Sequence, residues 1–598
     1  MDFDTVQKKN IAAVVIAVCA IVLVSAAVCC SGVLNNSSGP ETADTVVYGK
    51  IYTSDDGKYA EAFAVKDGKY IYVGDAEGAE DYIKEGTTEV IDYRDKGLIM
   101  PGATEGHGHY AAQGILQYLK FYVPGNNEKE VLDNVRTYVE THPDKEFYFT
   151  FGWSNVEMSS VKASLDMRTQ LDEICSDKIV IAVDDSGHNA FVNSKTLELA
   201  GVTVDTEIKG GVIGKIDKEI GGQTVKQLSG LLSDLAYNYV LKKTVANMEI
   251  FSENDYAGIC EAMEEALLSK GYTYYQDGWT NYFGTQIMDC LETYDKTVGL
   301  SVYVSGTYKI DSFDDWKSEV DSAAECKDKY ATDHFVYTTL KLFADGEAVE
   351  SGSGWLKGTY VNGTHGTQVW ETGVMNEMVK AANEKGLSVH VHAQGDAAVE
   401  QVVNAYIYAE DTAAEGVNNG ICHGRNITEE TKDAMAEHGI YASININWRT
   451  LIAEEYGPKY VEILLPEDIA KAGYPIKSLI DRGIVVTSST DVPAASGAPT
   501  TVSGIIEVAV NDTCSDKEVW KLNVAEEVTV EQAMDIMTIN GAKQLQIEDE
   551  RGSIEVGKYA DFLLFDKDFT SCAKDKIHEA NVAFVYFEGD KVYTCPSE

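Results

Sequence analysis

Residues 98–110 read Leu-Ile-Met-Pro-Gly-Ala-Thr-Glu-Gly-His-Gly-His-Tyr, and this stretch decides how the rest of the chain is interpreted. An apolar run typical of a buried strand stops at Pro-Gly and is followed by His107 and His109. Side chains two positions apart leave the same side of an extended backbone, so both imidazoles can face one cation. Gly108 between them leaves room for close approach to the backbone. The stretch therefore predicts a strand that ends in a metal site.

Three later stretches repeat this arrangement of a strand-like run that ends in a ligand-type side chain. They end in His392, in His423 and in Asp491, and helical patterns separate the runs. In a parallel barrel the carboxyl ends of all strands open at one mouth, where active sites are built. The sequence therefore predicts an α/β fold with a TIM-type (β/α)8 barrel that gathers these side chains at its mouth.

Strand patterns also fill both ends of the chain, outside the predicted barrel. Residues 44–100 and 546–598 alternate short strands with turns, so we expect the two ends to meet in one small β-sandwich. The barrel would then span residues 101–545, well above the usual size of about 250 residues. Large insertions are therefore required, and residues 110–178 are interpreted as one that can form a lid. Residues 31–43, rich in Ser, Asn and Gly, are interpreted as a flexible linker.

The amino terminus contains an uncharged apolar run, Ile11–Cys30. As a helix these residues would extend about 30 Å, enough to cross the core of a bilayer. Two lysines precede the run and no basic residue follows it until Lys50, which places residues 1–10 in the cytoplasm. A signal peptide cleaved near Ser25–Ala27 and a lipidated cysteine at the end of the run are the alternatives. Each version predicts a protein that is membrane-anchored with its catalytic part outside the cytoplasm, or secreted.

Composition and charge restrict the classes of partner. The chain has 598 residues, of which 96 are acidic and 49 basic, giving a formal charge of −47 that repels nucleic acid and anionic lipid. We therefore expect contact with a membrane only through the amino-terminal segment. The cysteines after that segment form no Cys-x-x-Cys pair, which excludes a zinc ribbon and a disulfide scaffold. One disulfide is predicted, between Cys572 and Cys595 in the terminal β-rich region.

An ordered set of residues resembles the amidohydrolase superfamily of metal-dependent hydrolases: His107-Gly108-His109, His392, His423 and Asp491. Three further stretches are similar to its YtcJ-like branch, amidohydrolase family 3: Asp185–Lys195, Lys341–Gly346 and His392–Ala397. Gly552–Phe562 is similar to the segment by which such enzymes return to a small β-domain. The resemblance covers residues 45–595. Glu105 stands where the family often has Asp, and Ala397 where an Arg is common.

The resemblance implies one or two divalent metal ions, zinc or a similar ion, for which imidazole is a favoured donor. The implied ligands are His107, His109, His392, His423 and Asp491. In some amidohydrolases a lysine at the end of the fourth barrel strand is carboxylated and bridges two metals. Lys341 is the residue that corresponds, and an ordinary ion pair with Asp345 or Glu347 is the alternative for it.

The resemblance also implies catalytic and substrate-binding roles. Asp491 would carry a proton, with a helix cap as the alternative, and His188 would hydrogen-bond the substrate carbonyl, with an ordinary loop histidine as the alternative. Trp153 is interpreted as a wall of the pocket or as a core aromatic. His390 shares a strand face with His392, so it lines the pocket or supports the site without being a ligand. The remaining histidines are expected at the surface: His142, His334, His365, His438 and His578.

Together these features predict a metal-dependent enzyme that hydrolyses a carbon-nitrogen bond, an amide or N-acyl bond, in a small molecule. A deaminase and an ester or lactone hydrolase would use the same ligands. A non-catalytic surface or regulatory protein on a hydrolase fold is a further alternative, since fold does not determine function. Assembly as a homo-oligomer is left open by the sequence.

Overall fold

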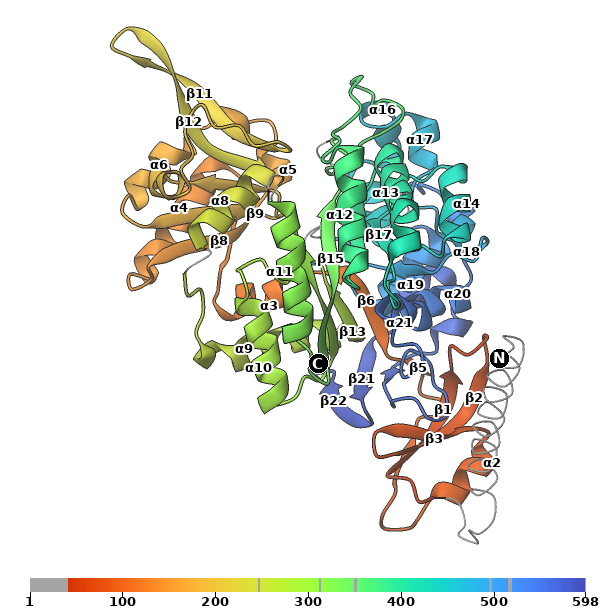
Figure 1. Cartoon of the computed structure of the whole chain (residues 1–598). Helices are drawn as coiled ribbons and strands as arrows, with labels where there is room; N and C mark the ends of the chain where they lie inside the picture. The colour runs from red at the N-terminus through yellow and green to blue at the C-terminus, as the bar shows by residue number, and fades with distance from the viewer. Residues whose placement is uncertain are drawn as a thin grey trace, which may run out of the picture.

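A parallel barrel forms the centre of the computed structural model, which describes residues 41–596 except 246–247, 311–312, 314, 349–351, 494–496 and 515–518 (Figure 1). Within this part of the chain, eight strands pair in the order β19-β18-β17-β16-β15-β14-β13-β6, and every neighbouring pair is parallel. The predicted barrel is therefore confirmed. Its strands are β6 (Ala103–Gly108), β13 (Tyr272–Asp277), β14 (Tyr303–Lys309), β15 (Phe335–Phe343), β16 (Ser388–Ala393), β17 (Gly420–His423), β18 (Tyr441–Ile444) and β19 (Val486–Ser488).

Helices between these strands, and α19 to α21 after the last of them, cover the outside of the barrel, so strands such as β6 and β16 are buried along their whole length. Burial does not make every strand apolar: β6 reads Ala-Thr-Glu-Gly-His-Gly, and the apolar run before it, Leu98–Pro101, is β5 of another sheet. The helices are α3 (Tyr110–Tyr118), α9 (Tyr256–Leu268), α10 (Gln286–Thr297), α11 (Trp316–Lys329), α12 (Thr372–Glu384), α13 (Asp396–Ala409), α14 (Glu429–Glu437), α15 (Trp448–Glu455), α16 (Tyr460–Ile463), α17 (Glu467–Lys471), α18 (Ile476–Ile480), α19 (Val502–Asn511), α20 (Val530–Met537) and α21 (Ile539–Leu545).

The first barrel strand, β6, and the segment just after the last one, β19, are joined by hydrogen bonds of side chains and of the backbone. The Glu105 carboxylate accepts hydrogen bonds from the Thr490 backbone N–H at 2.9 Å and from the Thr490 hydroxyl at 2.6 Å. Gly106 allows this close approach, because a Cβ there would lie 2.7 Å from the backbone oxygen of Ser488. We call this contact the seam. It brings the strand that carries the paired histidines beside the segment that carries Asp491.

Both ends of the chain pair in one sheet below the barrel, with strand order β22-β21-β20-β5-β1-β2-β3 and with β4 also paired to β1. Strand β20 runs antiparallel to β5, so residues from the two ends lie side by side. The hydrogen bonds describe one branched sheet, whereas the sequence predicted a sandwich. The elements are β1 (Thr45–Tyr52), β2 (Tyr59–Lys66), β3 (Lys69–Gly74), α2 (Ala76–Ala79), β4 (Glu89–Asp92), β5 (Leu98–Pro101), β20 (Phe562–Phe565), β21 (Val582–Phe587) and β22 (Asp590–Thr594).

The predicted disulfide between Cys572 and Cys595 is wrong, since both residues are free thiols in the structure. Cys572 follows a short 3-10 turn and donates to the backbone oxygens of Phe569 and Ala573 at 3.3 and 3.2 Å. Cys595 lies just beyond β22, where its backbone N–H is bonded to Ala583. Both thiols are exposed, and each is held by its own local backbone.

A separate α/β layer is inserted between α3 and α9, drawn in orange to yellow in Figure 1. We call residues Tyr122–Val245 the inserted domain. Its sheet has the order β11-β12-β10-β9-β8-β7. The predicted insertion, 110–178, was therefore too short, because β9 to β12 belong to the same sheet as β7 and β8. The elements are β7 (Tyr122–Gly125), α4 (Glu128–Thr141), β8 (Phe147–Trp153), α5 (Asn155–Met158), α6 (Met167–Ile174), β9 (Ile179–Asp184), β10 (Asn189–Val192), α7 (Ser194–Leu199), β11 (Gly211–Ile220), β12 (Gln223–Asp234) and α8 (Leu235–Val245).

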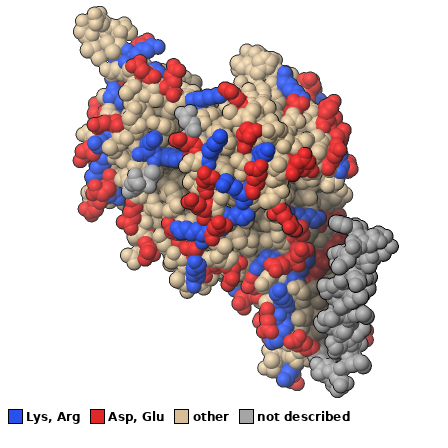
Figure 2. Space-filling view, viewed as in Figure 1, with Lys and Arg blue, Asp and Glu red and all other residues tan. Residues whose placement is uncertain are grey.

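Acidic and basic side chains are interspersed over the face drawn in Figure 2, with acidic residues numerous around the barrel helices. Among the described residues, the structure contains no helix with the length and apolar character needed to cross a bilayer. The predicted anchor or signal segment, residues 11–30, and the linker before residue 41 lie outside the described residues.

Candidate metal centre

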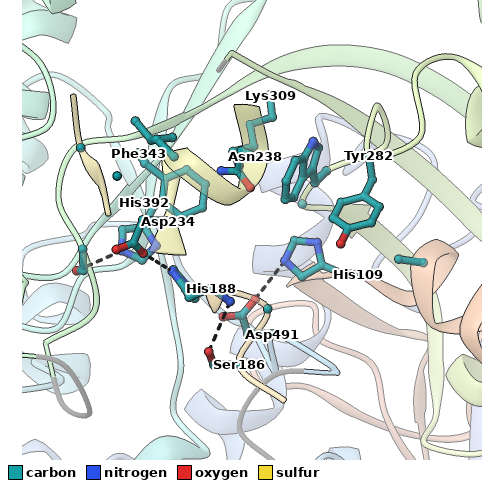
Figure 3. A pocket seen from close by; sticks show the side chains of 18 of the residues that line it. His109, Ser186, His188, Asp234, Asn238, Tyr282, Lys309, Phe343, His392 and Asp491 are labelled. Carbon is teal, nitrogen blue, oxygen red and sulfur yellow. Dashed lines mark hydrogen bonds and ion pairs between the residues drawn. The ribbon is translucent and has the colours of Figure 1, made fainter. Parts of the chain in front are cut away.

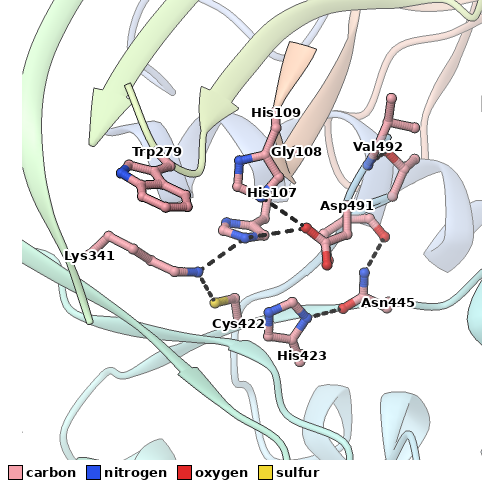
Figure 4. A network of polar contacts seen from close by, with 12 residues as sticks. His107, Gly108, His109, Trp279, Lys341, Cys422, His423, Asn445, Asp491 and Val492 are labelled. Atoms are coloured by element: carbon pink, nitrogen blue, oxygen red, sulfur yellow. Dashed lines mark hydrogen bonds and ion pairs between the residues drawn. The ribbon is translucent and has the colours of Figure 1, made fainter. Parts of the chain in front are cut away.

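The two histidines at the end of β6 face the carboxylate of Asp491 (Figure 4). An Asp491 carboxylate oxygen, Oδ1, lies 3.2 Å from His109 Nε2 and 3.7 Å from His107 Nε2. Asp491 has a left-handed backbone, with φ of 60°, and its N–H donates to the backbone oxygen of His107 at 3.0 Å. A residue held in this strained region signals a functional constraint. The residue that directly follows β13, Gly278, has to be a glycine, because a Cβ at this position would lie 2.5 Å from the His107 ring.

The other two predicted histidine ligands lie side by side on neighbouring strands. The rings of His392 on β16 and His423 on β17 have centroids 4.3 Å apart. Asn445 Oδ1 lies 2.6 Å from His423 Nδ1, which leaves Nε2 of that ring for a ligand. Phe343 stacks on His392 with a centroid distance of 4.5 Å and fixes that ring. The His107 and His423 rings are 5.3 Å apart, so all four histidines gather at one mouth.

Lys341 lies inside this group, on β15, the fourth barrel strand. Its Nζ is buried 3.1 Å from His107 Nε2 and 2.9 Å from Cys422 Sγ (Figure 4). These are its polar contacts among the described residues. Asp345, the partner of the alternative ion pair, instead accepts from the backbone N–H groups of Gln394, Gly395 and Trp355. The structure therefore places the lysine with the predicted ligands and away from the Asp345 carboxylate.

Two overlapping sets of ligand atoms result, and both contain His107. The atoms of His107, His109 and Asp491 all lie within 4.8 Å of one another, and so do those of His107, Cys422 and His423. Cys422 is the member of these two sets that the sequence did not predict as a ligand. The pairing of β17 with β16, which sets Cys422 opposite His392, turns its thiol toward Lys341 and makes it a further donor.

The buried imidazoles are kept neutral. Burial is the main cause that holds the pKa values of His107, His392 and His423 well below the ordinary range, and the charge of Lys341 adds to it. A neutral ring offers a nitrogen lone pair to a cation. Neutral imidazoles combined with a carboxylate and a thiol match the donor chemistry of zinc and related divalent ions. The residues present therefore fit a site for one or two metal ions.

His390 supports this site from behind. It is fully buried, with Nε2 at 3.1 Å from His107 Nδ1 and Nδ1 at 2.9 Å from the Tyr441 hydroxyl. These contacts orient the His107 ring so that its Nε2 points to Asp491. Of the two predicted roles, the structure supports positioning of a ligand, and His390 does not border the cavity described next.

A cavity of about 360 Å³ lies between the barrel mouth and the inserted domain (Figure 3). We call the barrel side, formed by His107, His109, His392, His423 and Asp491, the cavity floor. We call the opposite side, formed by inserted-domain residues that include Phe149, Phe151, Ser186, His188, Asp234 and Asn238, the cavity roof. A cavity of this size, with apolar walls and a few convergent polar groups, is suited to a small molecule.

Trp153 does not border this cavity, so its interpretation as a wall is wrong and the core alternative holds. The side chain is buried, stacks on Phe191 with a centroid distance of 4.6 Å and donates from Nε1 to the Ala182 backbone oxygen at 2.8 Å. Side chains of a strand alternate between its two faces, but Gly152 has a φ of 118° and breaks that alternation between Phe151 and Trp153. Phe149 and Phe151 therefore reach the cavity from β8, whereas Trp153 does not.

His188 reaches the cavity from the inserted domain, in the loop between β9 and β10. Its Nδ1 lies 2.8 Å from Asp234 Oδ1 at the end of β12 (Figure 3). Burial alone would lower the pKa of His188, but the hydrogen bond and charge of Asp234 outweigh it and raise the pKa to about 9. His188 is therefore a cation at neutral pH.

Comparison with known proteins agrees with this geometry. Residues 89–593 match the protein family described as "Amidohydrolase family". The chain belongs to the amidohydrolase family. The putative amidohydrolase YtcJ of Bacillus subtilis (strain 168) is 24% identical over 555 residues, 91% of this chain and 98% of that protein. N-substituted formamide deformylase of Arthrobacter pascens is 22% identical over 524 residues, 84% and 89% of the two chains. The chain thus fits the YtcJ-like branch.

A solved structure of an uncharacterized metal-dependent hydrolase from Pyrococcus furiosus superimposes on this amidohydrolase with a TM-score of 0.64 and 22% sequence identity. The match covers 88% of this chain and 99% of that one. At this identity the likeness supports the fold, including the barrel.

Two cavity residues of this amidohydrolase were missed from the sequence. Lys309 ends β14, and its Nζ lies 3.4 Å from the centroid of Trp279 and 4.8 Å from that of Phe343, so it brings a cation into an aromatic corner. The rule that located the ligands, a polar residue at the end of an apolar run, does not find Lys309, because β14 contains Ser305, Gly306 and Thr307. Asp234 carried no local signal either, because it becomes relevant only through its contact with His188, 46 residues away.

Proposed function

We propose that this amidohydrolase is a metal-dependent hydrolase that cleaves a carbon-nitrogen bond, an amide or N-acyl bond, in a small molecule. The observation that carries the proposal is the position of Asp491. It lies beside the paired histidines and borders the cavity, where it can touch both a metal and a substrate. The likeness to an enzyme named N-substituted formamide deformylase favours this bond type over an ester or a lactone.

The floor residues are proposed to bind the metal and transfer the proton, and His188 of the roof is proposed to bind the oxyanion. A bound divalent ion lowers the pKa of a water molecule toward neutrality and polarises a scissile carbonyl. His107, His109, His392, His423 and Asp491 would hold it. Asp491 accepts the proton of the attacking water and passes it to the leaving nitrogen. The His188 cation, held by Asp234, donates a hydrogen bond to the oxyanion that develops on the substrate.

Lys341 is proposed to be carboxylated on Nζ. The neutral amine attacks carbon dioxide, a nitrogen-carbon bond forms, and the amine proton leaves to water, so an anionic carbamate replaces a cation. The support is electrostatic, because a buried ammonium among imidazoles and a thiol is costly, whereas an anion there supplies metal ligands.

Substitution of Lys341 by Ala tests this proposal. We expect the wild-type intact mass to exceed the sequence mass by one carbon dioxide, and Lys341→Ala to lose both the extra mass and bound metal. Metal content is measured by elemental analysis, with Lys309→Ala as the control for loss of a cavity lysine. A wild-type protein that binds one equivalent of metal, with unchanged content in Lys341→Ala, contradicts a bridging role.

The function itself is tested with a panel of N-acyl and N-formyl compounds. Purified protein is stripped with a chelator and reconstituted with zinc, manganese or cobalt, and free amine is measured. We expect chelator-sensitive release of amine that metal restores and that Asp491→Asn lowers by about 10³-fold. Release of ammonia would instead identify a deaminase, and cleavage of esters or lactones alone would identify the other alternative. No turnover with any metal would favour the non-catalytic protein.

We further propose that the enzyme acts outside the cytoplasm, either anchored or secreted. The support is the uncharged run Ile11–Cys30 and the lysines that precede it. Fractionation of cells, followed by protease treatment of intact cells, tests this. A full-length protein that is found in the cytoplasmic fraction contradicts it.

A further inference from the structure

A second group of metal-binding side chains lies outside the cavity, where α19 packs on the carboxyl-terminal segment. Glu507 lies on α19, Cys514 follows that helix, and His578 lies on the 3-10 helix η8 (Lys574–Glu579). One ligand atom from each residue lies within 4.8 Å of the other two. These three residues are not among those that border the cavity. We call them the distal cluster.

Glu507 is a buried carboxylate with one oxygen that has no hydrogen-bond partner among the described residues. It interrupts an otherwise apolar helix and is fully inaccessible to solvent. Its Oε2 accepts from the His578 backbone N–H at 2.9 Å and lies 2.7 Å from His578 Nδ1. Its Oε1 is buried and has no hydrogen-bond partner among the described residues. A buried carboxylate oxygen without a partner is costly, and a cation would remove that cost.

Cys514 and His578 connect the buried Glu507 carboxylate to solvent and add a thiol and an imidazole as metal ligands. The His578 side chain is 23% exposed and Cys514 is half-buried, so an ion can enter from solvent. A thiolate, an imidazole and a carboxylate together are ligands that zinc takes, with water in a fourth position. His578 was interpreted from the sequence as a surface residue because its neighbours in the chain are polar. Its contact with Glu507, 71 residues earlier, leaves no local signal.

From this geometry we propose that Glu507, Cys514 and His578 form a zinc-binding site that is distinct from the catalytic centre. The ion would join α19, a helix of the barrel, to the segment that leads into β21 of the chain-end sheet. Its role is to clamp that sheet to the barrel, since binding to the folded chain alone stabilises it by mass action.

The first experiment uses the wild-type chain. Stripped protein is treated with a thiol-alkylating reagent with and without added zinc, and the modification of each cysteine is followed by mass spectrometry. We expect zinc to slow the alkylation of Cys514 by at least about tenfold, because a metal thiolate is a poor nucleophile. Cys572, an exposed thiol of the same segment, is the internal control and should not change. Equal rates at Cys514 with and without zinc overturn the proposal.

The second experiment counts ions in variants. We expect Cys514→Ser and His578→Gln each to bind one equivalent of zinc fewer than wild type, whereas Cys572→Ser binds the same amount. The zinc-dependent rise in melting temperature should shrink in the first two variants only. Unchanged zinc content in folded Cys514→Ser overturns the proposal. Turnover of an N-acyl substrate is recorded in parallel, so failure of the distal cluster is distinguished from failure of the catalytic proposal.

Discussion

The cavity floor and the cavity roof face each other but are built in different ways. The floor consists of side chains at the ends of barrel strands. His107, His392 and His423 are buried, with neighbours such as His390 and Asn445 fixing their rings, and His109 and Asp491 are 24% and 13% exposed. The roof comes from the inserted domain, and its ionic pair is only partly buried, with side-chain exposures of 30% for His188 and 42% for Asp234. The floor therefore carries the metal ligands, whereas the roof adds a cation and apolar walls. Changes in the floor should act on metal content and kcat. Changes in the roof should leave metal content unchanged, with His188 acting on kcat and its pH dependence and the apolar side chains acting on KM.

The largest effect is expected from Asp491→Asn in the floor. The amide keeps the shape but cannot accept the proton of the attacking water, so kcat should fall by about 10³-fold. Metal content by elemental analysis should stay close to wild type, because the histidines remain. Asp396→Asn, which alters a carboxylate that accepts from the Lys357 backbone, is the matched control. A variant that retains at least a tenth of wild-type kcat would show that the proton acceptor lies elsewhere.

An intermediate effect is expected from His188→Gln in the roof. Loss of a donor to the developing oxyanion should lower kcat by about 100-fold without changing metal content. His438→Gln, a variant of a histidine paired with Glu410 far from the cavity, is the control. Loss of metal in His188→Gln would place this residue with the floor and break the division.

The contact between His188 and Asp234 is expected to make kcat depend on pH. The pKa of His188 is raised to about 9, so the cation is present at neutral pH and kcat should fall as the pH rises through about 9. In the variant Asp234→Asn, the carboxylate that raises the pKa of His188 is gone, and burial then lowers this pKa. The alkaline limb of the kcat profile should therefore move to lower pH. The stabilisation from this pair is fully present below the unfolded pKa of about 6.5 and is lost as the pH rises through about 9. An unchanged alkaline limb in Asp234→Asn contradicts the assignment.

The smallest effect separates two aromatic residues of one strand. Phe151→Ala removes apolar surface from the roof and should raise KM by about tenfold, equivalent to about 1.4 kcal/mol of binding. Trp153→Phe should leave KM unchanged and lower the melting temperature, because it removes a core hydrogen bond to Ala182. Steady-state kinetics and thermal unfolding of both variants decide the matter. A rise in KM in Trp153→Phe would restore the wall interpretation.

The sequence predicted the floor far better than the roof, for a physical reason. The apolar runs before His392, His423 and Asp491 gave each of these side chains a local signal that one rule could find. The run before His107, Leu98–Pro101, is instead β5 of the chain-end sheet, and His107 lies on the next strand, β6. The roof depends on how the inserted domain folds on itself and then docks on the mouth. The pairing of His188 with Asp234, and the turn of Phe151 rather than Trp153 toward the cavity, arise from tertiary contacts. No local pattern marks them.

The distal cluster and Cys422 were missed for a related reason. A cysteine beside a histidine reads as a core residue until strand register turns its thiol toward Lys341. The chain-end sheet could be predicted from the sequence, because both ends of the chain have strand patterns, and the structure pairs strands from the two ends. Their hydrogen bonds, however, form a single branched sheet, a detail that alternation of apolar residues does not encode.

The seam has a consequence for biosynthesis. Glu105 and Thr490, which join the first barrel strand to the last, are 385 residues apart, and β20 to β22 must still be made after them. A nascent chain on the ribosome therefore exposes His107 and His109 long before Asp491 exists to face them. The predicted ligand set is therefore complete only once Asp491 has been synthesised and the seam has formed.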